Sequence, residues 1–207
     1  MAAVKFFLGL LCVIVIDNTR TGIRNPLKYR VDDGSDQRIV AAARKEIGTC
    51  EGDVPNAGPK VSQYLRYAGV KTAAPWCAAW VSYVFGQAGY AEPKTAWSPA
   101  LFPAKRSVAE ARPGLVLGIY YPSLKRIGHC GIVERVYGDW CMSIEGNTGN
   151  GNERDGDGVW RKMRHRRSIY RFANWKGGQI KAISSQAGTQ LRNAPGVCAE
   201  QLKFLEK

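Results

Sequence analysis

Cys77 is the residue of this sequence best placed to act as a nucleophile. It follows Pro75 and Trp76 in the stretch 75–89, whose apolar residues recur at steps of three and four. That spacing predicts an amphipathic helix with Pro75 and Cys77 in its first turn. There a thiol faces unpaired backbone N–H groups and the positive end of the helix dipole, and both favour the thiolate. Because a single cysteine is more often a small buried hydrophobic residue, a nucleophilic role requires partners elsewhere in the chain.

A base for such a thiol must come from one of two histidines. His129 stands immediately before a predicted strand, 130–137, whereas His165 lies in the basic run MRHRR. The flanking Arg164 and Arg166 would oppose protonation of His165 without holding its ring in place. His129 is therefore the predicted base.

Glu145 is the predicted partner of His129, in the role of a carboxylate that orients the imidazole. It ends a strand, 140–145, that the two-residue turn Gly138-Asp139 connects to the strand after His129. Pairing through this turn places Glu145 opposite Ile132, so that it reaches His129 by a diagonal offset.

Asn147 and Glu134 are the alternatives to Glu145. Asn147 follows two residues later and is the second choice, although a turn residue is the ordinary interpretation of an asparagine there. Glu134 shares a strand with His129 but lies several residues away, and it ranks lower.

No metal or cofactor is expected. The six cysteines contain no C-x-x-C pair, which argues against a zinc site, and at most two disulfides can form if Cys77 stays free. The segment 155–158, Asp-Gly-Asp-Gly, has two of the residues of a calcium loop but lacks the other ligand positions, so a turn is predicted.

Two further helices are predicted before Cys77. The first has Asp33 or Ser35 as its N-cap and stops at Gly48. The second opens at Pro59, which suits a first-turn position, and is ended by Gly69.

After the Cys77 helix the sequence changes to strand patterns. Residues 91–113 contain four prolines and predict an irregular segment that wraps the surface near the site. Short β-branched or aromatic runs separated by turn residues then predict five strands, at 115–121, 130–137, 140–145, 159–163 and 168–172. Helices followed by an antiparallel sheet make an α+β domain.

Length and composition fit one main domain with extensions. The chain has 207 residues, of which 45% are hydrophobic and 23% charged, as in a globular protein. The predicted domain covers 36–173, and the role of the extension 174–207 is open. Residues 1–35 hold an apolar run, 6–16, that is too short to span a bilayer of about 30 Å. A secretory signal, an anchor and a docking peptide remain alternatives for it.

The formal net charge of +13 favours polyanionic surroundings. Nucleic acid, anionic lipid and the anionic polymers of a bacterial envelope all qualify. The most basic segment, 161–171, alternates with apolar residues and is better interpreted as a solvated strand face, which makes nucleic acid an unlikely partner.

Three phrases, in order, carry a family resemblance: PWCAAWVSYVFGQAG, GHCGIVERV and SIEGNTGNG. Together they resemble the cysteine, histidine-dependent amidohydrolase/peptidase (CHAP) family, and the likeness extends over residues 36–172. It implies a papain-like arrangement of N-terminal helices on a C-terminal antiparallel sheet. It also implies that Cys77 is the nucleophile, His129 the base and Glu145 the orienting residue, with assistance from Asn147.

The function implied by this resemblance is hydrolysis of amide bonds in bacterial peptidoglycan. Members include N-acetylmuramoyl-L-alanine amidases, endopeptidases and phage endolysins, which act at the cell envelope or outside the cell. The alternative is a catalytically silent structural or cargo protein of a virion or envelope, docked through residues 1–16. A nucleic-acid binder is supported only by the charge. Cys130 departs from the family pattern because it places a second thiol directly after His129.

Overall fold

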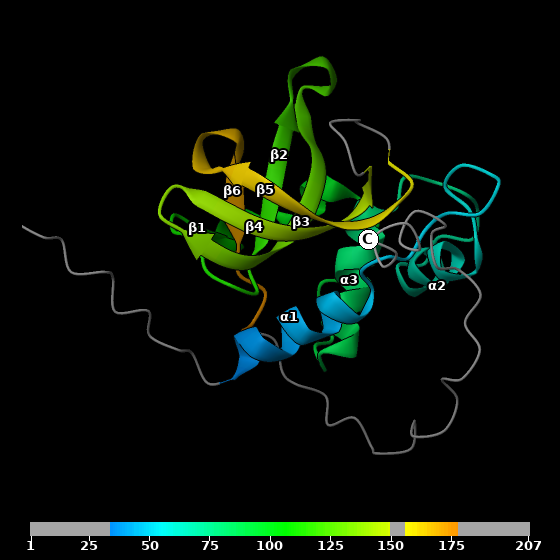
Figure 1. Ribbon diagram of the computed structural model, residues 1–207, viewed down its shortest axis with the longest axis horizontal. Coiled ribbons are helices and arrows are strands. Elements are labelled where there is room, and N and C mark those ends of the chain that lie inside the picture. Colours follow the sequence, from blue (N-terminus) through cyan, green and yellow to red (C-terminus); the bar gives the residue numbers. More distant parts are fainter. Residues whose placement is uncertain (1–33, 150–155, 178–207) are drawn as a thin grey trace, which may run out of the picture. The chain divides into compact units, whose positions relative to one another are not determined.

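The computed structural model describes residues 34–149 and 156–177, and in this part of the chain three α-helices precede an antiparallel sheet (Figure 1). The α+β order expected from the sequence is confirmed. The helices are α1 (Ser35–Lys45), α2 (Pro59–Tyr67) and α3 (Cys77–Gln87). The strands are β1 (Ser107–Val108), β2 (Val116–Tyr121), β3 (Arg126–Tyr137), β4 (Trp140–Thr148), β5 (Gly158–His165) and β6 (Arg171–Ala173). The predictions for residues 1–16 and for most of 174–207 lie outside the described residues, as does Asp155.

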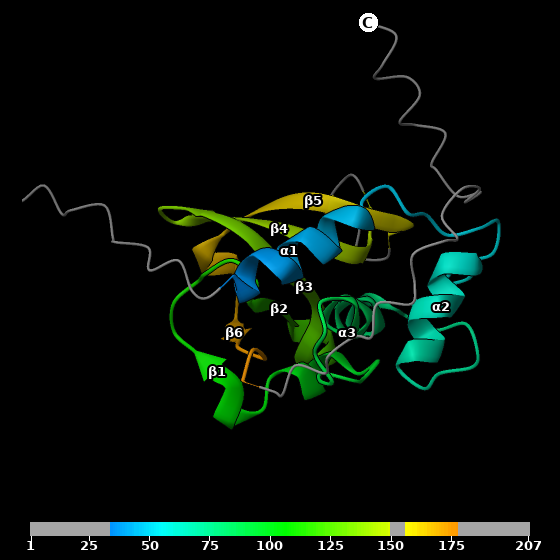
Figure 2. The same ribbon diagram turned by 90° about the horizontal axis from the view of Figure 1, so that it is seen from below.

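Helix α3 is buried on all sides, which corrects the prediction of an amphipathic helix. Every residue from Cys77 to Phe85 is buried. The reason is its position, since α3 contacts α1 and α2 as well as strands β3 and β4 (Figure 2). A helix enclosed in this way has no solvent face to mark with polar residues.

The helix boundaries differ from the predicted ones in detail. Trp76 is the N-cap of α3, so Pro75 precedes the helix instead of lying in its first turn. Gly34 caps α1 with a φ of 77°, in place of the polar cap expected from Asp33 or Ser35, and this cap makes no side-chain hydrogen bond. The start of α2 at Pro59 is confirmed.

The six strands of the described sheet lie in the order β1-β6-β2-β3-β4-β5. Strand β1 lies in the proline-containing segment that was predicted to be irregular, and it pairs with β6 at the edge of the sheet. The last strand is shorter than predicted because residues Arg166–Ser168 form a 3₁₀ turn. None of the described helices is long and apolar enough to cross a membrane.

The hairpin between β3 and β4 turns at Gly138-Asp139 as predicted, and Tyr137 pairs with Trp140. Further along, the register shifts at Glu134, so that Ile132 pairs with Ile144. This β-bulge is an extra residue in β3. It moves Glu145 opposite Gly131 and corrects the predicted pairing with Ile132.

Two apolar clusters occupy the two faces of the sheet. The larger joins α3 to the sheet through Trp76, Trp80, Phe85, Ile132 and Ile144. The smaller contains Leu115, Leu117, Val133, Cys141, Ile169 and Phe172. Burial on both faces fixes β3 and β4, which carry the candidate site, between two packed layers.

Candidate active site

Cys77 is the first residue of α3, and its side chain is 4% exposed. It is a free thiol whose Sγ lies 3.4 Å from Oγ of Ser98. The Cys130 thiol, together with hydrogen bonds from His129 and Ser98, holds the pKa of Cys77 well below its ordinary value, although burial opposes this shift. The site therefore favours a thiolate at Cys77.

His129 lies in β3, buried beside that thiolate. Its Nε2 is 2.8 Å from Oε2 of Glu145, which leaves Nδ1 as the ring nitrogen available to Cys77. Burial lowers the pKa of His129, but hydrogen bonds with Cys77 and Glu145 outweigh it and raise the pKa to about 9. A thiolate and an imidazolium are thus the favoured forms near neutral pH.

Glu145 is completely buried in β4 and accepts four hydrogen bonds. Oε1 accepts from Ser143 Oγ at 2.6 Å and from Arg164 Nε at 2.9 Å. Oε2 accepts from Arg164 Nη2 at 2.6 Å and from His129. Burial alone would raise the pKa of Glu145, but Arg164 and His129 hold it well below its usual range. The carboxylate therefore stays charged and fixed against the imidazole.

The β-bulge at Glu134 explains why His129 and Glu145 meet. Side chains alternate across a strand, so residues opposite each other share a face. Opposite Ile132, Glu145 would point away from the face of His129; opposite Gly131, it points to the same face. A Cβ on Gly131 would lie 2.4 Å from Cγ of Glu145, so the absence of a side chain there makes room for the carboxylate.

Asn147 contacts the start of α3 instead of His129. Its backbone is left-handed, with a φ of 55°. With the amide turned to suit its neighbours, its oxygen accepts from the Trp76 N–H at 3.2 Å and its nitrogen donates to the Gly156 carbonyl at 2.8 Å. These contacts suit a residue that positions the start of helix α3, and a direct role beside the imidazole remains a prediction.

Glu134 and His165, the two side chains that ranked lower, have other partners. Glu134 accepts from Arg44 at 2.6 Å and from Arg161 at 2.8 Å. His165 accepts from the backbone N–H of Arg167, and its ring meets Trp140 edge to face.

Arg164, Ser143 and Ser98 are the side chains of the site that sequence reasoning missed. Ser143 could have been found, since it lies two residues before Glu145 and so on the same face of the strand. Arg164 needed the pairing of β4 with β5, in which it lies opposite Cys141. No sequence pattern placed Ser98 near Cys77, because Ser98 lies in the proline-containing segment 91–113, which has no regular periodicity.

Cys130 is a second free thiol of the site and is completely buried. Its burial and its hydrogen bond with Cys77 raise its pKa well above the ordinary value. It therefore stays protonated and acts as a donor toward Cys77.

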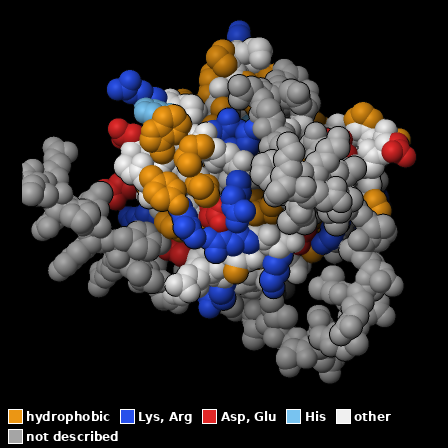
Figure 3. All heavy atoms as spheres, viewed as in Figure 1, with side chains coloured by type: hydrophobic (Ala, Val, Ile, Leu, Met, Phe, Trp, Pro, Cys, Tyr) orange, Lys and Arg blue, Asp and Glu red, His pale blue; other side chains and the backbone are white. Residues whose placement is uncertain are grey.

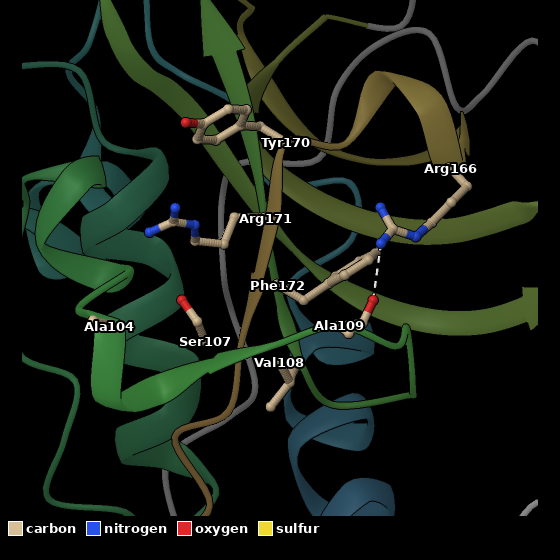
Figure 4. Close-up of a pocket in the computed structure, with 8 residues that line it drawn as sticks. All are labelled: Ala104, Ser107, Val108, Ala109, Arg166, Tyr170, Arg171 and Phe172. Atoms are coloured by element: carbon tan, nitrogen blue, oxygen red, sulfur yellow. Dashed lines mark hydrogen bonds between the residues drawn. The ribbon is translucent and has the colours of Figure 1, made fainter.

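Hollows elsewhere on the described part of the chain lie away from these residues. One, of about 380 Å³, is lined by residues of β1 and β6 and of the segments next to them, among them Ser107, Tyr170 and Arg171 (Figure 4). Its lining contains no thiol, histidine or carboxylate. Another is apolar and is lined by Tyr137, Trp140, Met142 and Met163. In the described part of the chain, no group of three or more His, Cys, Asp or Glu residues is arranged to hold a metal.

No family model and no curated protein sequence matches the chain. Among solved structures, the chain is similar to the crystal structure of Ly7917, with 15% identity and a TM-score of 0.40 over 66% of this chain and 60% of that one. It is also similar to Ly7917 with the hydrolyzing product of MDP, with 16% identity and a TM-score of 0.37 over 66% and 61%. The chain thus spans about 60% of the length of these structures. Similarity at this level establishes neither a family nor an activity.

Proposed function

We propose that this chain is a papain-like cysteine hydrolase of the CHAP type that cleaves amide bonds in bacterial peptidoglycan. The observation that carries the proposal is the placement of His129 between Cys77 and the buried carboxylate of Glu145. A nucleophile, a base and a group that orients the base are the parts that covalent acyl transfer requires.

The reaction would begin with attack of the Cys77 thiolate on an amide carbonyl. Backbone N–H groups at the start of α3 have no partner within the helix and would stabilise the developing oxyanion. As the C–N bond breaks, the imidazolium of His129 gives its proton to the leaving amine. Water then attacks the thioester while His129 takes a proton from it, and cleavage of the C–S bond restores the thiolate and the imidazolium.

The substrate class rests on the CHAP-like motifs, and the charge agrees with it. A net charge of +13 favours association with the anionic polymers of a bacterial envelope. The enzyme would then act in the envelope or outside the cell, and phage-encoded or virion-associated versions fit the same chemistry.

The proposal is tested by digestion of purified peptidoglycan with the full chain and with C77A and H129A. Each variant should lose at least about 1,000-fold in rate, because a nucleophile and its base act as one unit. Cys141→Ala is the matched control, since Cys141 is also a buried free thiol but belongs to the smaller apolar cluster. It should keep its activity.

Mass spectrometry of the released fragments separates an amidase, which frees the stem peptide from the sugar, from an endopeptidase. Equal activity in C77A and wild type would contradict the assignment. A folded wild-type chain that cleaves nothing would favour the alternative of a silent structural or cargo protein.

A further inference from the structure

Trp97 and Arg126 form a stacked pair that the proposed catalytic steps do not use. The guanidinium carbon of Arg126 lies 4.2 Å from the centre of the Trp97 ring. Trp97 is 53% exposed, whereas Trp76 and Trp80 are completely buried in the core. An exposed tryptophan covered on one face by a cation is a poor contributor to a core and a good recognition surface.

The pair joins the two segments that bring groups to the nucleophile. Trp97 is followed directly by Ser98, whose hydroxyl lies 3.4 Å from the Cys77 sulfur. Arg126 begins β3, and His129 comes three residues later, about 10 Å along the strand. A substrate whose carbonyl reaches Cys77 would therefore come near this pair within a few residues of its own length.

The Arg126 guanidinium has N–H donors that the hydrogen bonds found among the described residues do not use. Its Nη1 donates to the carbonyl of Ile127 at 3.1 Å, and the ion pairs found among the described residues do not include it. Arg44 and Arg161 differ from it, since both bind Glu134. Contact with the Trp97 ring restricts the movement of the Arg126 guanidinium. A planar fork held in this way suits a carboxylate, which it can bind through two parallel hydrogen bonds.

We propose that Trp97 and Arg126 form a carboxylate-binding subsite that recognises an acidic residue of the peptide stem next to the scissile amide. This inference rests on the proposed function and specifies its substrate. Arg126 would bind the free carboxylate, and Trp97 would hold Arg126 in the orientation that binding needs.

The test uses two stem peptides that differ in one group, a free carboxylate or its primary carboxamide, at the residue next to the scissile bond. Binding and hydrolysis of both are measured with the full chain and with R126Q, R126K and W97A. The wild type should prefer the carboxylate. R126Q should lose about 10- to 100-fold in kcat/KM for it, mainly through KM, as expected for hydrogen bonds to a charged group, with little change for the carboxamide.

R126K should recover only part of this loss, because an ammonium group has no planar fork. W97A should weaken the preference without changing the pH dependence of hydrolysis. Arg171→Gln is the matched control: Arg171 also lies over an exposed aromatic ring, that of Tyr170 at 5.5 Å, but in the hollow of Figure 4. It should leave the preference unchanged.

Equal binding of the two peptides by the wild type, or a preference that survives in R126Q, would overturn the subsite. Binding of a glycerol-phosphate polymer that depends on Arg126, without such binding of the acidic peptide, would also overturn it, since the anion recognised would then be a phosphate. Carboxylate-selective binding that depends on Arg126 but is followed by no hydrolysis would support the subsite and refute the proposed enzyme.

Discussion

The carboxylate of Glu145 is the most enclosed charge of the site, and its charge depends on Arg164. Burying a carboxylate is costly unless hydrogen bonds replace those of water. Arg164 supplies two of the four that Glu145 accepts, and its own side chain is 27% exposed. The charge that contacts His129 is thus maintained by Arg164, for which no contact with Cys77 is found among the described residues.

Arg164→Met should therefore impair activity and stability together. Without the two hydrogen bonds, burial raises the pKa of Glu145. The carboxyl group is then more easily protonated, and its hydrogen bond with His129 weakens. We expect a loss of about 3 kcal/mol in the free energy of unfolding, measured by urea titration. Arg167→Met, at an exposed position on the following turn, is the control and should stay within about 0.5 kcal/mol of wild type. An Arg164 variant with unchanged stability and rate would show that Glu145 does not need this partner.

The pKa of His129 predicts the alkaline limit of hydrolysis. In the proposed mechanism, hydrolysis needs the imidazolium, so the rate should fall as the pH passes about 9. Glu145 raises this pKa, and Glu145→Gln should move the alkaline limb to lower pH. A pH–rate profile of both proteins is the measurement, and coinciding alkaline limbs would contradict the orienting role of Glu145.

The free energy of unfolding should also depend on pH through the titration of His129. The pKa of His129 is higher in the folded protein, at about 9, than its ordinary value of 6.5. Its protonated form therefore stabilises the folded state fully below pH 6.5, and this contribution is lost as the pH rises through 9. Measured by urea titration across this range, the free energy of unfolding should decline more steeply for wild type than for His129→Gln.

At the scale of elements, the site depends on a close approach between α3, β3 and β4. Gly146 of β4 faces α3, and a Cβ there would lie 2.7 Å from Trp80 and 2.9 Å from Trp76. Gly131 of β3 faces the other way, toward Glu145. The two glycines thus have different tasks, one in packing the helix and one in seating the carboxylate.

Alanine at each position should separate these tasks. Gly146→Ala should lower the free energy of unfolding by about 1–3 kcal/mol through overpacking against the two tryptophans. Gly131→Ala should reduce kcat more than its effect on stability explains, because it displaces Glu145. Gly52→Ala, where the nearest atom is 3.8 Å away, is the control. Thermal unfolding and steady-state kinetics of the three variants give the comparison, and equal kinetic defects in all of them would contradict it.

At the scale of the whole molecule, basic and apolar side chains share one face. Figure 3 shows apolar side chains gathered over the sheet, with Lys and Arg beside them. Among the exposed apolar side chains of the sheet are Trp140 and Met163, which are about half exposed and line one apolar hollow. A surface of this kind suits contact with a large anionic polymer better than binding of a small molecule.

Attachment to cell walls should therefore depend on salt. Co-sedimentation with intact walls should weaken steadily between about 50 and 300 mM salt, since the Debye length falls below 10 Å in this range. Walls stripped of their phosphate polymers should bind less protein at low salt and show a flatter dependence. Binding that does not respond to salt would show that the net charge of +13 has no part in attachment.

Local sequence patterns predicted three helices followed by antiparallel strands, with Cys77 at a helix start and His129 and Glu145 on the two sides of one hairpin. Strands β3 and β4 are longer than predicted, since β3 begins before His129 and β4 continues past Glu145, and β1 was not predicted. Periodicity, proline and glycine act over a few neighbouring residues, so they mark a helix start or a hairpin turn without knowledge of distant contacts.

The way in which those elements meet comes from contacts between residues distant in the sequence. The bulge at Glu134 sets which face Glu145 shares, and the pairing of β4 with β5 brings in Arg164. Ser98 reaches Cys77 from a segment with no regular pattern, and the burial of α3 on every side comes from neighbours distant in sequence. These features depend on long-range packing and on register, where a shift of one residue turns a side chain to the opposite face, and local sequence patterns do not encode such a shift.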